Sequence, residues 1–228
     1  KFYALPQAPQ QFKQMVMISG FDKYFQIAPC FRDEDGRADR SPGEHYQLDM
    51  EMSFVEQEDV FKAVEPIFFD LFTEFGKGRT ISKAPFKRIT YKNSMLKYGT
   101  DKPDLRNPIE IFDVTEIMKR DDVKLDIFKK LIDKGGVVRA IPAPSTSSKP
   151  RSFFDGYNNW AKEEGAKGLG YILLEKNNGK LIGKGPIGKL FSEKAISELV
   201  QNCKLKEKDS VFFSSDKTKE AERISGIA

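Results

Sequence analysis

Three arginines and four acidic residues share nine consecutive positions, residues 32–40, between two strand-like stretches of the sequence. The arginines are Arg32, Arg37 and Arg40. A surface turn does not need so dense a set of opposite charges. A site that binds a polyanion and a metal-bound phosphate does, because guanidinium groups bind phosphate and carboxylate oxygens in pairs. This loop is therefore the first candidate for chemistry.

The stretch that follows the loop has the clearest alternation in the chain and predicts a strand over residues 46–56. Apolar side chains occupy one side of it, and the other side carries Gln47, Asp49, Glu51 and Ser53. Such a polar row is often only the solvent-facing side of a sheet. An antiparallel hairpin with predicted strand 24–32 would instead place the row beside Arg32 and Glu34, as the floor of an active site.

A helix is predicted over residues 9–18, and on it Gln10 and Lys13 lie three positions apart, side by side on one face. Two interpretations remain open for this pair. It is either part of a solvated helix face or a pair of side chains directed into a pocket.

The remaining sequence predicts a two-part chain. A long helix over residues 57–76, a short strand over 86–91 and a short helix over 93–98 lead to a turn-rich connector that ends at residue 108. Helices and strands then alternate, which predicts a separate α+β or α/β module: helices over 123–133, 152–164 and 193–203, and strands over 136–142, 169–175 and 210–214. The glycines of residues 179–188 lack phosphate-loop spacing and fit a hairpin or loop better.

The composition is that of an ordinary globular protein, since 39% of the residues are hydrophobic and 32% are charged. A net charge of +4 permits an anionic partner without requiring one. With one histidine and two cysteines far apart, a zinc site is improbable, and a reduced, cytoplasmic protein is the simplest interpretation. No apolar run approaches the roughly 18 residues of a membrane span. Because the sequence opens without methionine and stops within a helical pattern, we expect a fragment of a longer chain.

Three stretches together resemble the bacterial-type aspartyl-tRNA synthetases, which are class II aminoacyl-tRNA synthetases. CFRDEDGRADR (30–40) with QLDME (47–51) resembles motif 2 of class II, FYALPQAPQQFKQ (2–14) looks like the segment before it, and YGTDKPDLRNP (98–108) is similar to the subfamily's connector. The resemblance implies an α+β fold: part of the antiparallel class II catalytic domain over residues 1–108, and the smaller α+β insertion called the GAD domain over residues 109–228.

The resemblance also implies an activity, in which L-aspartate is activated with ATP and Mg²⁺ and then transferred to the 3′ end of tRNA. Arg32 would be the catalytic arginine that joins the α-phosphate of ATP to the aspartate carboxylate. The other implied roles fall in three groups: aspartate binding by Gln10, Lys13, Gln47 and Asp49 with Arg32; ATP binding by Arg32, Asp33, Glu34, Ser41 and His45; and binding of the tRNA acceptor end by Glu34, Arg37 and Arg40.

Two positions depart from the family pattern. Ser41 stands where many relatives carry glutamine, which puts a nucleotide contact there in question. His45 stands where relatives carry a phenylalanine that stacks on adenine, and we expect the imidazole ring to stack in the same way.

The resemblance further implies a homodimeric parent protein. Motifs 1 and 3 and the anticodon-binding domain lie outside this sequence, so we predict that the fragment alone is inactive in adenylation. Two alternatives remain: a relative specific for asparagine or lysine, and a non-enzymatic tRNA-binding or amidotransferase-associated module that keeps only part of the hairpin.

Overall fold

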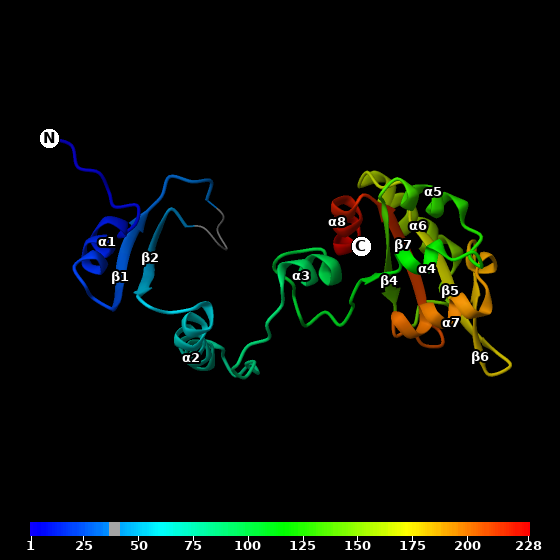
Figure 1. Ribbon diagram of the computed structural model, residues 1–228, viewed down its shortest axis with the longest axis horizontal. Coiled ribbons are helices and arrows are strands. Elements are labelled where there is room, and N and C mark those ends of the chain that lie inside the picture. The colour runs from blue at the N-terminus through cyan, green and yellow to red at the C-terminus, as the bar shows by residue number, and fades with distance from the viewer. Residues whose placement is uncertain (37–41) are drawn as a thin grey trace. The chain divides into compact units, whose positions relative to one another are not determined.

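The computed structural model describes residues 1–36 and 42–228 and divides the chain into two compact units, Lys1–Lys87 and Arg88–Ala228. This division lies earlier than the boundary expected after residue 108. Residues 88–108 group with the second unit because helix α3 (Tyr91–Tyr98) packs on helix α8 (Thr218–Ile227), and because the N–H of Ile111 donates to the carbonyl of Lys97 at 2.8 Å. Figure 1 shows the elements of both units.

The first unit contains the predicted hairpin. Strands β1 (Lys23–Phe31) and β2 (Glu44–Met52) pair antiparallel, with Gln26 opposite Asp49, Ala28 opposite Gln47 and Cys30 opposite His45. Helices precede and follow this pair as expected, α1 (Gln10–Ile18) and α2 (Gln57–Phe75).

Burial on the hairpin is the reverse of the usual pattern. The polar face holds the buried residues Ala28, Cys30 and Asp49, while Phe25 and Ile27 on the apolar face are 71% and 66% exposed. Helix α1 lies over the polar face, where Lys13 contacts two residues of β2. The alternation of β2 was therefore predicted correctly. Its polar face is covered by α1, so the interpretation of this face as solvent-facing does not hold.

The strand expected over residues 86–91 is wrong. Within this described stretch the backbone forms no strand, because other partners take its hydrogen-bonding groups. The N–H of Phe86 donates to Oε1 of Glu65 on α2 at 3.1 Å, and the carbonyl of Thr90 accepts from the N–H of Ser94 in α3 at 2.9 Å. The helix predicted after it is present and ends at Gly99, whose φ of 66° suits glycine.

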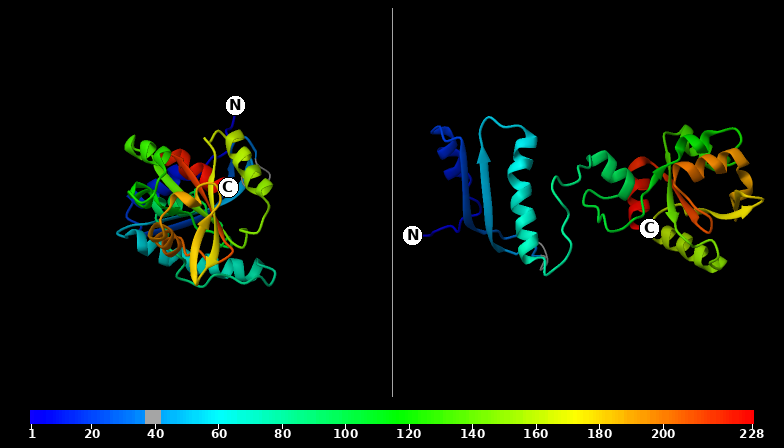
Figure 2. Two further views of the ribbon diagram at one scale, coloured as in Figure 1. Left: turned by 90° about the vertical axis from the view of Figure 1, so that its right-hand side faces the viewer. Right: turned by 90° about the horizontal axis from the view of Figure 1, so that it is seen from below.

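A five-stranded antiparallel sheet forms the centre of the second unit, all of it within the described residues 112–216 (Figure 2). Its strand order is β3 (Phe112–Asp113), β4 (Val137–Ala143), β7 (Ser210–Asp216), β5 (Gly170–Asn177) and β6 (Lys180–Lys184). Strands β5 and β6 form a hairpin whose turn, Asn178 and Gly179, has positive φ at both residues. The glycine-rich stretch is thus a hairpin followed by a short 3₁₀ helix, η1 (Gly188–Leu190).

Helices cover both faces of this sheet. One face packs against α4 (Thr115–Lys119), α5 (Asp126–Asp133) and α7 (Glu193–Asn202), and its core includes Ile172, Val211 and Phe213. The other face packs against α6 (Arg151–Glu163) and α8, and its core includes Tyr171 and Phe212. Alternate residues of β5 and β7 therefore supply two separate cores, and the chain has the expected α+β class.

Candidate functional site

Lys13 is the centre of the polar face. Its Nζ atom lies 3.1 Å from Oδ1 of Asp49 and 2.7 Å from Oε1 of Glu51, and its side chain is only 13% exposed. The hydrogen bonds to Glu51 and to Asp49 raise the pKa of the Lys13 ammonium group above its ordinary value. Lys13 is therefore directed toward β2 rather than into solvent, whereas Gln10, the other member of the predicted pair, is exposed.

Gln47 links this ion pair to Arg32. Its Nε2 donates to Oδ1 of Asp49 at 3.2 Å, and its Oε1 accepts from Nη2 of Arg32 at 3.3 Å. Four of the residues predicted for the site therefore form one hydrogen-bonded row, Arg32–Gln47–Asp49–Lys13, which we call the polar row. The second oxygen of Asp49, Oδ2, is buried and has no hydrogen-bond partner among the described residues.

The strand register explains why these side chains meet. Cross-strand pairs point to the same face of an antiparallel sheet, so Asp49, Gln47 and their partners Gln26 and Ala28 share the polar face. The ladder continues past the end of β1, because the N–H of Arg32 donates to the carbonyl of Gly43 at 2.7 Å. Arg32 therefore lies at the end of the polar face rather than in the freely exposed loop.

Other predicted residues are not brought into the polar row. Gln10 is exposed at the start of α1, and Asp33 and Glu34 are exposed directly after Arg32. His45 lies opposite Cys30, and its Nδ1 is buried without a hydrogen-bond partner in the part of the chain that the structure describes. Arg37, Arg40 and Ser41 lie outside the described residues.

Sequence reasoning assigned no role to Glu51 or Cys30, which both contact the polar row. Glu51 is the second carboxylate on Lys13, and the Sγ of Cys30 lies 3.8 Å from Oε1 of Gln47. The alternation of β2 was a sufficient signal for Glu51, because it places this residue on the same face as Asp49. The contact of Cys30 with Gln47 could have been predicted only from the pairing register of β1 and β2.

Among residues 1–36 and 42–228 no group of three or more histidine, cysteine or acidic side chains is arranged to hold a metal ion. We therefore assign no protein ligand to the expected Mg²⁺. Nor is any helix in these ranges long and apolar enough to pass through a lipid bilayer.

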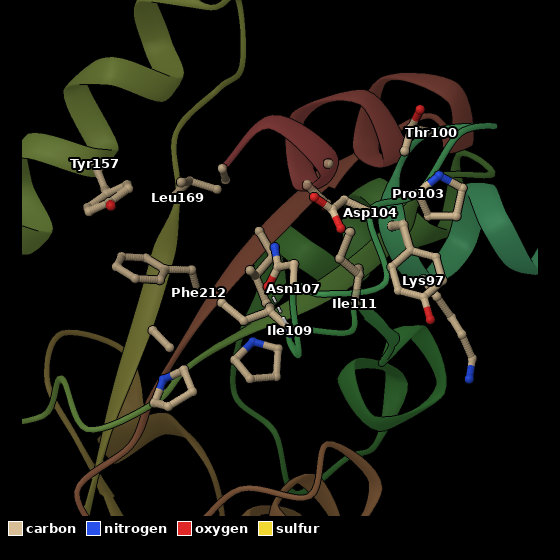
Figure 3. A pocket seen from close by; sticks show the side chains of 18 of the residues that line it. Lys97, Thr100, Pro103, Asp104, Asn107, Ile109, Ile111, Tyr157, Leu169 and Phe212 are labelled. Carbon is tan, nitrogen blue, oxygen red and sulfur yellow. Dashed lines mark hydrogen bonds between the residues drawn. The ribbon is translucent and has the colours of Figure 1, made fainter. Parts of the chain in front are cut away.

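The second unit has an apolar cavity of about 580 Å³ (Figure 3). Tyr157, Leu169 and Phe212 form one wall, and Ile109 and Ile111 lie across from them. The charged side chains at its rim have partners, since Lys97 pairs with Glu110 at 3.4 Å and Asp104 binds Arg106. The Arg106 guanidinium lowers the pKa of Asp104 to about 2. The cavity therefore offers shape but no arrangement of groups for catalysis.

The comparison with protein families matches residues 1–221 to the model of the tRNA synthetases class II (D, K and N). Over its full length the chain is 58% identical to an aspartate–tRNA(Asp/Asn) ligase of Beijerinckia indica and 59% identical to one of Methylobacterium nodulans, and it spans 38% of each. It is also 59% identical to such a ligase of Paramagnetospirillum magneticum, of which it spans 25%. The chain thus covers well under half the length of these relatives. A match of this extent shows that the chain belongs to the class II tRNA synthetases of the D, K and N group.

Proposed function

We propose that the protein containing this chain is an aspartate–tRNA ligase, which activates L-aspartate with ATP and transfers it to the 3′ end of tRNA. Family membership and the names of the relatives support this activity. The observation that carries the proposal is the position of Lys13 in the polar row.

Lys13 is suited to a third carboxylate. Its ammonium group has three hydrogen-bond donors, and Asp49 and Glu51 engage two of them. The remaining donor is free for the side-chain carboxylate of an aspartate substrate. A neutral asparagine side chain would gain much less from the same contact, because charge-assisted hydrogen bonds are about twice as strong as neutral ones.

The rest of the polar row suits the other substrate groups. Asp49 has a buried oxygen that lacks a partner among the described residues, and with Gln47 it would accept hydrogen bonds from the substrate ammonium group. Arg32 would hold the substrate carboxylate and the α-phosphate of ATP together and offset the charge that develops between them. Gln10 would complete the aspartate site from α1.

ATP would lie beyond Arg32, with Asp33, Glu34, Ser41 and His45 as its remaining contacts. Bound Mg²⁺ would neutralise part of the phosphate charge. Glu34, Arg37 and Arg40 would contact the acceptor end of the tRNA, where the arginines bind phosphates and so position the RNA.

We further propose that the parent protein charges both tRNA(Asp) and tRNA(Asn), as the names of its relatives state for those proteins. The second unit would be the GAD insertion domain of that parent, which would act as a cytoplasmic homodimer.

The test is aspartate-dependent exchange of pyrophosphate into ATP by the full-length protein, followed by charging of the two tRNA transcripts. We expect exchange with aspartate and none with asparagine or lysine, and charging of both transcripts. Exchange that depends on asparagine or lysine would reject the assignment of the substrate. Charging of tRNA(Asp) alone would reject only the proposal that the protein charges both tRNAs. Binding of tRNA without pyrophosphate exchange would favour the non-enzymatic module.

A further inference from the structure

A second hollow of the second unit, of about 470 Å³, lies between α5 and the start of β5. Its floor is apolar and includes Leu125, Phe128 and Leu169, which are all buried. Three lysines stand around it, Lys130 on α5, Lys134 directly after α5 and Lys167 just before β5. We call this hollow the lysine groove.

The charge of the lysine groove is largely uncompensated. The described residues that line it include three lysines and no acidic side chain. Lys130 and Lys134 form no ion pair with the described residues, and Lys167 has only a long pair with Asp216, 3.9 Å between Nζ and Oδ2. That pair is solvent-exposed, so it binds Lys167 weakly.

Helical spacing explains why α5 presents this charge to the groove. Ile127, Lys130, Leu131 and Lys134 follow one another at intervals of three, one and three residues and so share one helix face. Asp126 and Asp133 do not line the groove. Ile127 is 74% exposed at its edge, so the lysines border a surface that is partly apolar.

The opposite wall is fixed by close backbone packing. A Cβ atom at Gly168 would lie 2.6 Å from Oδ1 of Asn158, which accepts a hydrogen bond from the N–H of Leu169 at 2.9 Å. Because Gly168 also has a φ of 132°, glycine is required at this position. The backbone segment that carries Lys167 is therefore held in place opposite α5.

We propose that the lysine groove binds backbone phosphates of the tRNA, a contact that rests on the proposed function. Lysine binds phosphate as a point charge. The other polar side chains in the lining are Asn158, whose Oδ1 accepts from the N–H of Leu169, and Ser215. The groove can therefore neutralise phosphates but has little means of distinguishing bases, so it would position the tRNA without reading its sequence.

The test uses the full-length protein and its tRNA(Asp). A triple variant, Lys130→Ala with Lys134→Ala and Lys167→Ala, removes the groove charge. A control triple, Lys176→Ala with Lys194→Ala and Lys219→Ala, removes the same charge from exposed lysines of the same unit that do not line the groove. A third variant carries arginine at the three groove positions and retains their charge.

We expect the KM for tRNA to rise on the order of tenfold in the groove variant, and little in the control or the arginine variant. The slope of log binding constant against log salt should become shallower by about 2 to 3, since each lost phosphate contact removes somewhat less than one unit. Aspartate-dependent pyrophosphate exchange, which needs no tRNA, should remain unchanged in all three variants.

Two outcomes would overturn the proposal. If the control variant raises the KM for tRNA as much as the groove variant, the increase results from the lower net charge of the protein and not from the loss of a contact in the groove. If the groove variant leaves the KM and the salt slope unchanged, the groove binds no tRNA, and an acidic peptide becomes the better candidate. Failure of the unaltered protein to catalyse pyrophosphate exchange would reject the proposed function instead, and direct measurement of tRNA binding would still test the groove.

Discussion

The Nζ atom of Lys13 lies 2.7 Å from Oε1 of Glu51, closer than it lies to Asp49, which sequence reasoning had chosen as a neighbour in the site. Two carboxylates thus hold one ammonium group against β2. This arrangement fixes both the position and the protonation state of Lys13.

Replacement of Lys13 by methionine in the full-length protein should lower kcat/KM for aspartate on the order of a hundredfold, because it removes a charge-assisted hydrogen bond to the substrate. The KM for ATP should change little. Kinetics of pyrophosphate exchange with each substrate varied in turn would check this. Gln14→Met is the matched control, since Gln14 is the exposed neighbour of Lys13 on α1. A wild-type KM for aspartate in the Lys13 variant would show that Lys13 does not bind the substrate.

The raised pKa of Lys13 also predicts how the KM for aspartate depends on pH. The pKa of Lys13 is raised, so its ion pairs contribute their full stability below the ordinary lysine value of 10.5 and lose it as pH rises through the raised value. The KM for aspartate should therefore show no ionisation of Lys13 between pH 7 and about 9.5. A pH profile of kcat/KM for aspartate that falls with an alkaline pKa near 8 or 9, and loses this limb in Lys13→Met, would contradict the raised pKa.

Gly226 on α8 packs directly against Gly99 at the end of α3. A Cβ atom at Gly226 would lie 2.7 Å from the Cα of Gly99 and 2.9 Å from the carbonyl oxygen of Tyr98. Gly226→Ala should destabilise the second unit by about 1–3 kcal/mol, as overpacking does. Urea unfolding followed by the fluorescence of Trp160, the single tryptophan, would measure the change.

Gly156 on α6 is the control for this substitution. A Cβ atom there would meet nothing within 4 Å, so Gly156→Ala should stabilise the chain by about 0.5–1 kcal/mol through helix propensity. The two substitutions should therefore shift the unfolding midpoint in opposite directions. If both substitutions instead raised the unfolding midpoint, the α3–α8 contact would be able to relax without cost.

Asp122 joins Arg120 to the start of α7. Its two oxygens accept from Nε and Nη2 of Arg120, both at 2.8 Å, and Ser192, the N-cap of α7, donates to it. The hydrogen bonds from Arg120 and Ser192 lower the pKa of Asp122. Stability from this group is therefore present above its ordinary pKa of 3.8 and is lost as pH falls through the lowered value.

Asp122→Asn should therefore destabilise the chain near pH 6, and only modestly, because the Asp122 side chain is 35% exposed and solvent screens its ion pair. The difference from the unaltered chain should shrink at pH 3. Urea unfolding at both pH values would measure it, with Asp121→Asn, the exposed neighbour, as control. An equal loss of stability at pH 6 and pH 3 would show that the charge of Asp122 is not the cause.

Both cysteines should resist thiol reagents in the folded chain. Burial raises the pKa of the Cys203 thiol to about 12, so almost no reactive thiolate exists at pH 8, and Cys30 is fully buried. Ellman's reagent should label neither residue in the native chain and two thiols per chain in guanidinium chloride. Rapid reaction of one thiol without denaturant would show that a buried segment opens readily.

The alternation of residues 46–56 was enough to predict the hairpin and which side chains share its faces. It could not predict that the polar face would be the covered one. That outcome depends on α1, which brings Lys13 over Asp49 and Glu51, and a contact across 36 positions leaves no local signal.

Tertiary contacts also decided the positions where the structure differs from what the local sequence pattern indicates. Residues 86–91 have strand-like composition, but the N–H of Phe86 donates to Glu65 and the carbonyl of Thr90 accepts from the N–H of Ser94 in α3. The turn-rich connector was expected to be a boundary, yet Gly99 packs on α8, so the division falls before it. Local pattern predicted most elements correctly because helix and strand periodicity is set by neighbouring residues, and it did not predict contacts between distant ones.

The polar row contains two cations, Arg32 and Lys13, and Asp49 and Glu51 balance them with two anions. Counted together with Glu51, the polar row is therefore electroneutral and creates little long-range attraction for a small anion such as aspartate. It can orient the amino acid by short contacts but does little to accelerate its arrival, so the capture rate for aspartate at this row should depend only weakly on ionic strength.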